Sequence, residues 1–139
     1  MQMMPISVAA AAALIFSLLS GPAARAASET IVSGEDASRV LGLADVKVKA
    51  GTVSGVLVNK SPHPIREVQL LIDHVWFWND ERHPGEDNPG RSDYYTVHGE
   101  VPLHGSLPFT YHPSPPLPRR GDGHFGTSVQ VVGFVEVGQ

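Results

Sequence analysis

Histidine is the residue type in this chain with the widest chemical capacity, since there are seven histidines and no cysteine. Five of them fall in polar segments or at the ends of expected strands: His83, His98, His104, His112 and His124. Three imidazoles with one open coordination position would suit zinc or copper, so their convergence would make a metal site. No two of them have the short spacing that places a ligand pair on one strand or helix. The alternative is that they are solvated surface residues.

Trp76, Phe77 and Trp78 form the densest aromatic cluster, directly after His74 and Val75. Side chains two residues apart on a strand share a face, so the two tryptophans point the same way. They either fill the core, as the apolar residues before them on that face suggest, or form an exposed platform if the strand outruns its sheet. His74 shares their face, where a histidine bonded to a backbone carbonyl is expected.

The polar segment from Asn79 to Arg91 is the strongest candidate for a binding surface, because it exceeds the usual length of a hairpin loop. Its acidic residues suit calcium, but the alternating oxygen ligands of an EF-hand are absent and Pro84 and Pro89 interrupt the spacing. Internal salt bridges that fix the loop are the alternative. We predict binding residues in and beside this loop: Trp76, Trp78, Asp80, Arg82, His83 and Arg91.

Two short motifs outside this region have plain interpretations. Arg120-Gly121-Asp122 matches an integrin-type tripeptide, but we interpret it as a hairpin turn. Asn59-Lys60-Ser61 has the form of an N-glycosylation acceptor, which matters only in a host that glycosylates.

Catalytic motifs are absent from the sequence. There is no G-x-S-x-G elbow for a serine nucleophile, and the carboxylates of Glu67, Asp73 and Glu100 have no spacing typical of a glycosidase pair. A chain without cysteine holds no thiolate zinc site, iron–sulfur cluster or cysteine nucleophile. We therefore predict a protein that is not an enzyme and has no cofactor.

The N-terminal segment has the features of a cleavable signal peptide. Ile6 to Leu19 is an almost unbroken apolar run, Gly21-Pro22 follows, and Ala24-Arg25-Ala26 supplies small residues for a signal peptidase. A membrane anchor is the alternative, but the run of roughly 14 residues is shorter than the about 20 needed to cross a bilayer. We predict cleavage after Ala26, a periplasmic or secreted location and no stable membrane insertion afterwards.

The charge balance bears on the partners. The chain has 14 acidic and 10 basic side chains, and Arg119-Arg120 is the only basic pair after the signal peptide. Nucleic-acid binding needs a basic face, so we expect a protein or a cell-envelope component as the partner instead.

Residues 46–139 have the alternating pattern of a β-domain, with expected strands at 46–50, 53–59, 65–78, 93–98, 107–111 and 125–137. The longest, 65–78, puts Val68, Leu70 and Ile72 on one face and Glu67 and Asp73 on the other. Residues 27–45 are expected to be either a flexible leader or a short helix with Ser33 as its N-cap. Six to seven strands without a long helix predict an all-β immunoglobulin-like sandwich, with a small barrel as the alternative.

The runs VSGVLVNKS at 53–61, IREVQLLI at 65–72 and GSLPF at 105–109 resemble the strands of FxLYD-type and related immunoglobulin-like domains of exported bacterial proteins. The sequence departs from that family at 75–80, where VWFWND replaces the aromatic-Leu-Tyr-Asp stretch. The resemblance implies an immunoglobulin-like fold, an extracytoplasmic setting and no enzymatic activity. The function expected is thus a non-enzymatic binding module, with a histidine-based zinc or copper protein as the alternative.

Overall fold

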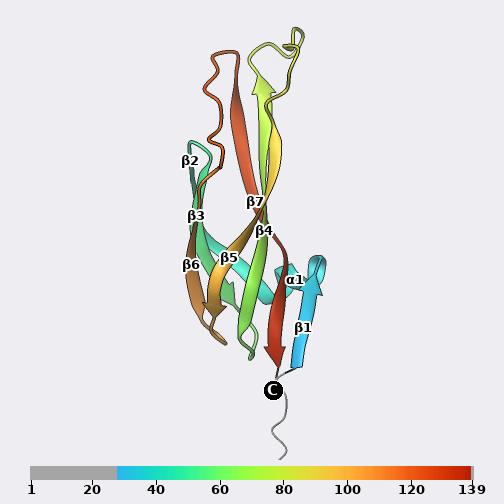
Figure 1. Ribbon diagram of the computed structural model, residues 1–139, viewed down its shortest axis with the longest axis vertical. Coiled ribbons are helices and arrows are strands. Elements are labelled where there is room, and N and C mark those ends of the chain that lie inside the picture. The colour runs from blue at the N-terminus through green and yellow to red at the C-terminus, as the bar shows by residue number, and fades with distance from the viewer. Residues whose placement is uncertain (1–27, 139) are drawn as a thin grey trace, which may run out of the picture.

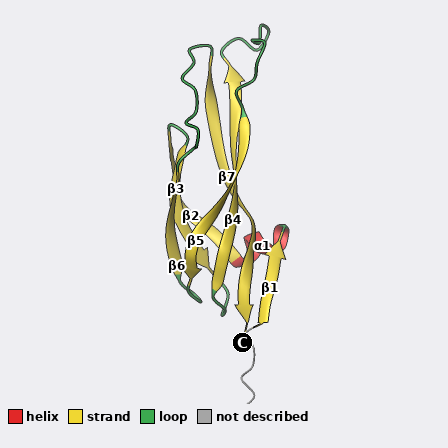
Figure 2. Cartoon of the chain, in the orientation of Figure 1, coloured by secondary structure: helices red, strands yellow, loops and turns green. Residues whose placement is uncertain are grey.

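The computed structural model describes residues 28–138, which form seven strands and one short helix (Figures 1 and 2). The predicted signal peptide, residues 1–26, lies outside the described residues. The elements are β1 (Ser28–Ser33), α1 (Glu35–Val40), β2 (Leu41–Lys49), β3 (Thr52–Asn59), β4 (Ile65–Trp78), β5 (Arg91–Val101), β6 (Ser106–Tyr111) and β7 (Gly123–Gly138).

The strands form two antiparallel sheets that pack face to face. One sheet has the order β1-β7-β4-β5 and the other the order β2-β3-β6. Across residues 28–138 the two sheets stay separate and do not close into a barrel. The prediction of an all-β sandwich is therefore confirmed.

The predicted alternation of β4 sets the position of the core. Val68, Leu70, Ile72 and His74 are buried, whereas the odd-numbered residues from Glu67 onward are exposed or half-buried. These side chains meet those of Val53, Leu57, Val97, Val101, Phe109 and Tyr111 between the two sheets. Apolar burial between the layers is thus the main stabilising contribution to the sandwich.

Residues 28–45 are part of the sandwich, which differs from the leader expected in the sequence analysis. Ser28–Ser33 pairs with the C-terminal end of β7, from Ser28 opposite Gly138 to Ser33 opposite Gly133. The helix alternative holds for α1, but its N-cap is Gly34, with φ of 66°, rather than Ser33. Both ends of the described chain therefore lie side by side at one end of the molecule (Figure 1).

β2 begins at Leu41, five residues before the alternation becomes visible in the sequence. A bulge between Ala44 and Lys47 interrupts its pairing with β3, and Asp45 within it has a positive φ of 52°. A bulge inserts an extra residue and resets the phase of the alternation. This is why a two-residue period could be recognised only from Val46 onward.

Asn59 closes the sandwich at the end where Ser28 and Gly138 lie. It is buried, and its Nδ2 donates to the carbonyl oxygens of His63 (2.7 Å), Pro102 (3.1 Å) and Val101 (3.3 Å). A buried amide that ties three backbone segments together is a structural group. It is not accessible to a glycosyl donor in the folded chain.

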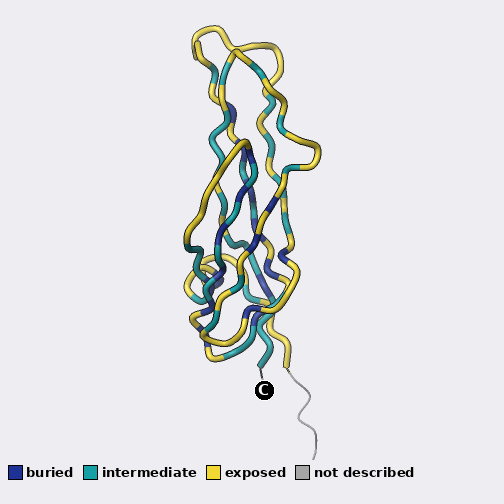
Figure 3. Tube along the Cα trace, turned by 90° about the vertical axis from the view of Figure 1, so that its left-hand side faces the viewer, coloured by how far each residue is buried: buried dark blue, intermediate teal, exposed yellow. Residues whose placement is uncertain are grey.

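At the opposite end, β4 and β7 continue beyond all the other strands. Their pairing extends to Trp78 opposite Gly123, whereas β5 leaves β4 at His74 opposite Arg91. We call this two-stranded extension, Val75–Trp78 with Gly123–Gly126, the ribbon. It projects past the three-stranded sheet together with its loops, and most of the chain around its tip is exposed (Figures 1 and 3).

The packing of β4 predicts the cost of truncating one of its core residues. Ile72→Ala should lower the free energy of unfolding by about 2 to 5 kcal/mol, because it removes a fully buried side chain and leaves a cavity. Val75→Ala on the exposed face of the same strand is the control and should change it by no more than about 0.5 kcal/mol. Equal losses in urea denaturation would contradict this assignment of the faces.

Candidate functional site

The inner side of the ribbon is an aromatic cluster built by the two-residue period of β4. The ring of Trp76 meets that of Trp78 edge-on at a centroid distance of 5.7 Å and that of Phe125 at 4.8 Å. Trp76 is only 6% exposed. Of the two interpretations of the tryptophans, core filling therefore describes Trp76, although the core that it fills is that of the ribbon.

Two glycines allow the chain to pass close to these rings. A Cβ atom at Gly123 would lie 2.4 Å from the Trp76 ring, and one at Gly85 would lie 2.8 Å from Trp78. Trp78 is half-buried because the loop between β4 and β5 folds against it at Gly85. Neither ring is presented as an open platform.

Arg120 covers both tryptophans. Its guanidinium carbon lies 5.2 Å from the centroid of Trp76 and 5.4 Å from that of Trp78, within cation–π range. The same guanidinium donates to Asp122 (2.7 and 3.0 Å) and to Asp87 (3.0 Å). The stacking and the ion pairs together join the segment before β7 to the loop before β5.

The ion pair with Asp122 shifts both pKa values in the direction that favours charge. Its hydrogen bond raises the pKa of Arg120 and lowers the pKa of Asp122 from their ordinary values. Each partner therefore favours the charged form of the other.

The residues predicted for the site fall into three places. Trp76 and Trp78 lie inside the ribbon, under Arg120. Asp80, Arg82 and His83 form the turn at the exposed tip, where Asp80 accepts from the backbone nitrogen of Arg82 (3.1 Å) and pairs with His83 Nδ1 (2.9 Å). This pairing is the internal type of loop contact that the sequence offered as an alternative to calcium binding.

Arg91 lies apart from the other predicted residues, where the loop joins β5. Its Nε donates to Asp93 at 3.2 Å and its terminal nitrogen donates to the Pro115 carbonyl at 2.6 Å. It therefore holds the proline-rich connection against the top of the sandwich.

Sequence reasoning missed Arg120 as the centre of the cluster and interpreted it only as part of a turn. The available signal was the pair of tryptophans at the end of an unusually long strand, since aromatic side chains that extend beyond a sheet need a cover from elsewhere in the chain. Asp87 and Asp122 are the acidic residues that this cover requires.

Below the ribbon, a buried polar chain centres on His74. Its Nδ1 lies 2.9 Å from Thr127 Oγ1, and its Nε2 lies 3.4 Å from the hydroxyl of Tyr111, which donates to Asp93. Burial and the hydrogen bond to Asp93 raise the pKa of Tyr111 to about 12. The partner of His74 is thus a set of side chains rather than the backbone carbonyl expected for a core histidine.

The pKa of His74 is lowered, first by burial and then by Arg91, although Asp93 and Asp73 act in the opposite direction. His74 is 1% exposed, so no substrate reaches its ring. The arrangement stabilises a neutral imidazole between the sheets and offers no accessible acid or base.

Two further observations concern metal binding and insertion into a membrane. Among residues 28–138, no group of three or more histidine, aspartate or glutamate side chains is placed to hold a metal ion. In the same range, no helix is long and apolar enough to cross a membrane.

No family model, curated protein or solved structure matches the chain.

The lowered pKa of His74 predicts a specific dependence of stability on pH. Well above pH 6.5 His74 is neutral in both states and contributes no pH dependence. Below it the unfolded chain binds a proton more readily, so the free energy of unfolding falls by at most about 1.4 kcal/mol per pH unit until the lowered pKa is passed. His74→Gln should remove this part of the slope in urea titrations between pH 7 and 5, while His98→Gln, an exposed control, should retain it.

The position of Arg120 predicts a local effect on the two segments that it joins. Arg120→Gln should speed amide hydrogen exchange in residues 79–90 and 112–122, because the cation over the tryptophans and both ion pairs are lost. Exchange in β3 and β6 should stay unchanged. Arg119→Gln is the matched control, and equal effects of the two substitutions would refute a specific role for Arg120.

Proposed function

We propose that this protein is a non-enzymatic, extracytoplasmic β-sandwich module that binds a protein or another component of the cell envelope, with the ribbon as its recognition element. The extracytoplasmic setting rests on the predicted signal peptide. The observation that carries the proposal is the shape of the ribbon, which extends two strands and two long loops beyond the sandwich.

The outer face of the ribbon supports this role better than its inner face. The inner tryptophans are occupied by Arg120 and Phe125, whereas on the outer face Val75 is 49% exposed and Phe77 is 44% exposed. His124 stacks on Phe77 at a centroid distance of 5.4 Å. An aromatic anchor on a supported, projecting surface is typical of a protein-binding hot spot.

The internal packing of the ribbon explains why such a surface can be rigid. A two-stranded hairpin alone is marginally stable in water. Here the aromatic cluster and Arg120 supply a small core, so the outer side chains are held in place before a partner arrives. Preorganisation of this kind reduces the entropy that binding costs.

Site-specific photo-crosslinking tests the proposal. The phenylalanine analogue benzoylphenylalanine at position 77 should crosslink to a defined set of envelope components in cells that express the full chain. The same analogue at Leu103 is the control, because Leu103 is also exposed (52%) but lies in the turn after β5, at the other end of the sandwich. Phe77→Ser should retain the fold but lose partner binding, and identical crosslinks from positions 77 and 103 would refute the ribbon as the recognition element.

A further inference from the structure

β7 lies inside the larger sheet, but one of its edges is unpaired over part of its length. β7 pairs with β4 along most of its length, but on its other side β1 pairs only with residues 133–138. Gly34 then turns the chain into α1, and the last backbone bond in this row runs from Gly34 N to Val132 O at 3.4 Å. Within residues 28–138, no strand pairs with residues 123–131 of β7 on that side.

This stretch also lacks the features that protect strand edges. Edge strands are usually protected by charged side chains, proline, bulges or short length. The other edges follow this rule: β1 and β6 are short, β6 contains Pro108, and β2 carries Lys47, Lys49 and a bulge. β5 carries Arg91, Asp93 and Glu100. By contrast, the sequence GHFGTSVQV at 123–131 contains no acidic or basic residue other than one histidine, and no proline.

Two hollows lie beside the free edge, between β7 and the edge strand β2 of the other sheet, and we call them together the groove. One hollow of about 600 Å³ lies between β7 residues 129–132 and β2 residues 41–43, beside α1. A second, of about 390 Å³, follows along the same two strands, between Phe125 and Thr127 on one side and Val48 and Ala50 on the other. Leu117, Pro118 and Arg119 of the connection before β7 also line the second hollow.

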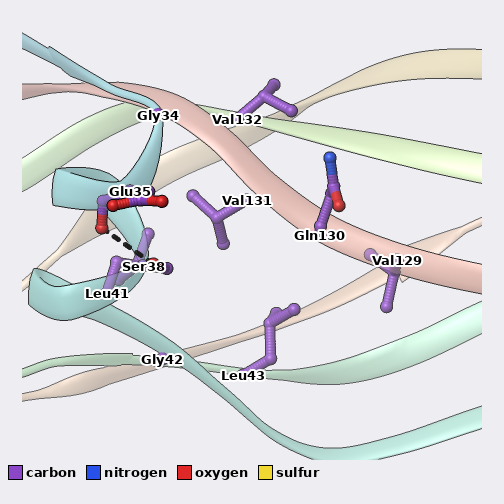
Figure 4. A pocket seen from close by; sticks show the side chains of 10 residues that line it. All are labelled: Gly34, Glu35, Ser38, Leu41, Gly42, Leu43, Val129, Gln130, Val131 and Val132. Atoms are coloured by element: carbon purple, nitrogen blue, oxygen red, sulfur yellow. Dashed lines mark hydrogen bonds between the residues drawn. The ribbon is translucent and has the colours of Figure 1, made fainter.

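Apolar side chains line the groove because no further strand of the larger sheet covers this side of the core. Figure 4 shows Val129 and Val131 pointing toward Leu41 and Leu43, while Gln130 points away. Val129 and Val131 are only half-buried, although Ile72 and Leu70 beside them on β4 are fully buried. Val48 is 45% exposed on the face that it shares with buried Val53. A strand added to β7 would cover these side chains with its own alternate residues.

The charges at the two ends of the groove give the added strand a direction. Glu35 lines the end beside α1, and Arg119 lines the other end. A strand antiparallel to β7 would begin at Glu35 and end at Arg119, in the same direction as β1. A cation at its start and a carboxylate at its end would therefore meet opposite charges.

We propose that the free edge of β7 and this groove form a strand-addition site. Its occupant is an extended segment of a partner protein, antiparallel to β7 along residues 123–131. The segment alternates apolar and polar residues, begins with a basic residue and ends with an acidic one. Main-chain hydrogen bonds to β7 supply affinity, and the groove selects the apolar side chains. This surface is separate from the outer face of the ribbon, so it adds a second contact to the proposed function.

A designed peptide tests the site. The probe is a synthetic peptide of alternating valine and threonine with lysine first and glutamate last, added to the mature chain and followed by amide hydrogen exchange. Binding should slow exchange of those amides in residues 123–131 that do not already bond to β4. The same peptide with lysine and glutamate interchanged should bind more weakly, and one methylated on alternate backbone nitrogens should lose the protection.

A matched pair of substitutions separates the groove from the rest of the surface. Val48→Lys places a charge in the groove and should weaken binding of the peptide by about tenfold. Val46→Lys is the control, because Val46 is similarly exposed (40%) but does not line either hollow. Both variants should keep the thermal unfolding midpoint of the parent chain.

Three results would overturn the proposal. The first is peptide binding without slower exchange at 123–131, and the second is equal weakening by Val48→Lys and Val46→Lys. The third is slow exchange at 123–131 without peptide that depends on protein concentration, since this would assign the edge to a second copy of the chain.

Discussion

The pairing of β4 with β7 is the interaction on which the rest of this structure depends. It joins Ile65 to Glu136 at one end of the molecule and Trp78 to Gly123 at the other. Within the sandwich, this pair supplies the central strands of the larger sheet, and beyond it the same two strands become the ribbon. The register that buries Leu70 and Ile72 therefore also decides that Trp76 and Trp78 share one face of the ribbon, because the side-chain period of a strand is two throughout.

The buried polar groups lie at the end of the sandwich where β4 and β7 continue into the ribbon. His74 is the last residue of β4 that faces the other sheet, and its neighbours Thr127, Tyr111 and Asp93 come from three further strands. Arg91 and the Pro115 carbonyl close this network from above. A satisfied polar layer at this point separates two apolar clusters, the core between the sheets and the aromatic cluster of the ribbon.

The sequence was sufficient for the parts of the fold that rest on local periodicity. The alternation in 65–78 predicted which residues of β4 are buried, and the turn signals predicted where the polar loop begins. It was not sufficient where the decisive partner is distant in the chain. β1 has almost no buried side chain of its own and is recognisable only through its pairing with β7.

The same limit applies to the candidate site. The tryptophans and the loop were visible as unusual residues, but Arg120 lies more than forty positions after Trp78 and reaches it only through the fold. Arg91 looked like a member of the loop because it stands at the loop's end in the sequence. The pairing of β4 with β5 instead places it opposite His74, below the ribbon. Spacing along one strand could be inferred from the residue pattern, whereas convergence between strands could not.

Ser28 and Gly138 lie opposite each other on paired strands, so anything attached at either residue would extend from the same end of the molecule. Both residues lie at the end of the molecule opposite the ribbon. The 14 residues of β4 separate the two ends by roughly 45 Å, at about 3.3 Å per residue. If a tether, a fused domain or a solid support were joined at Ser28 or Gly138, Phe77 would lie at the far end of the molecule from the attachment. Ser28 and Gly138 are thus equivalent as attachment points, and an attachment at either would lie away from the ribbon.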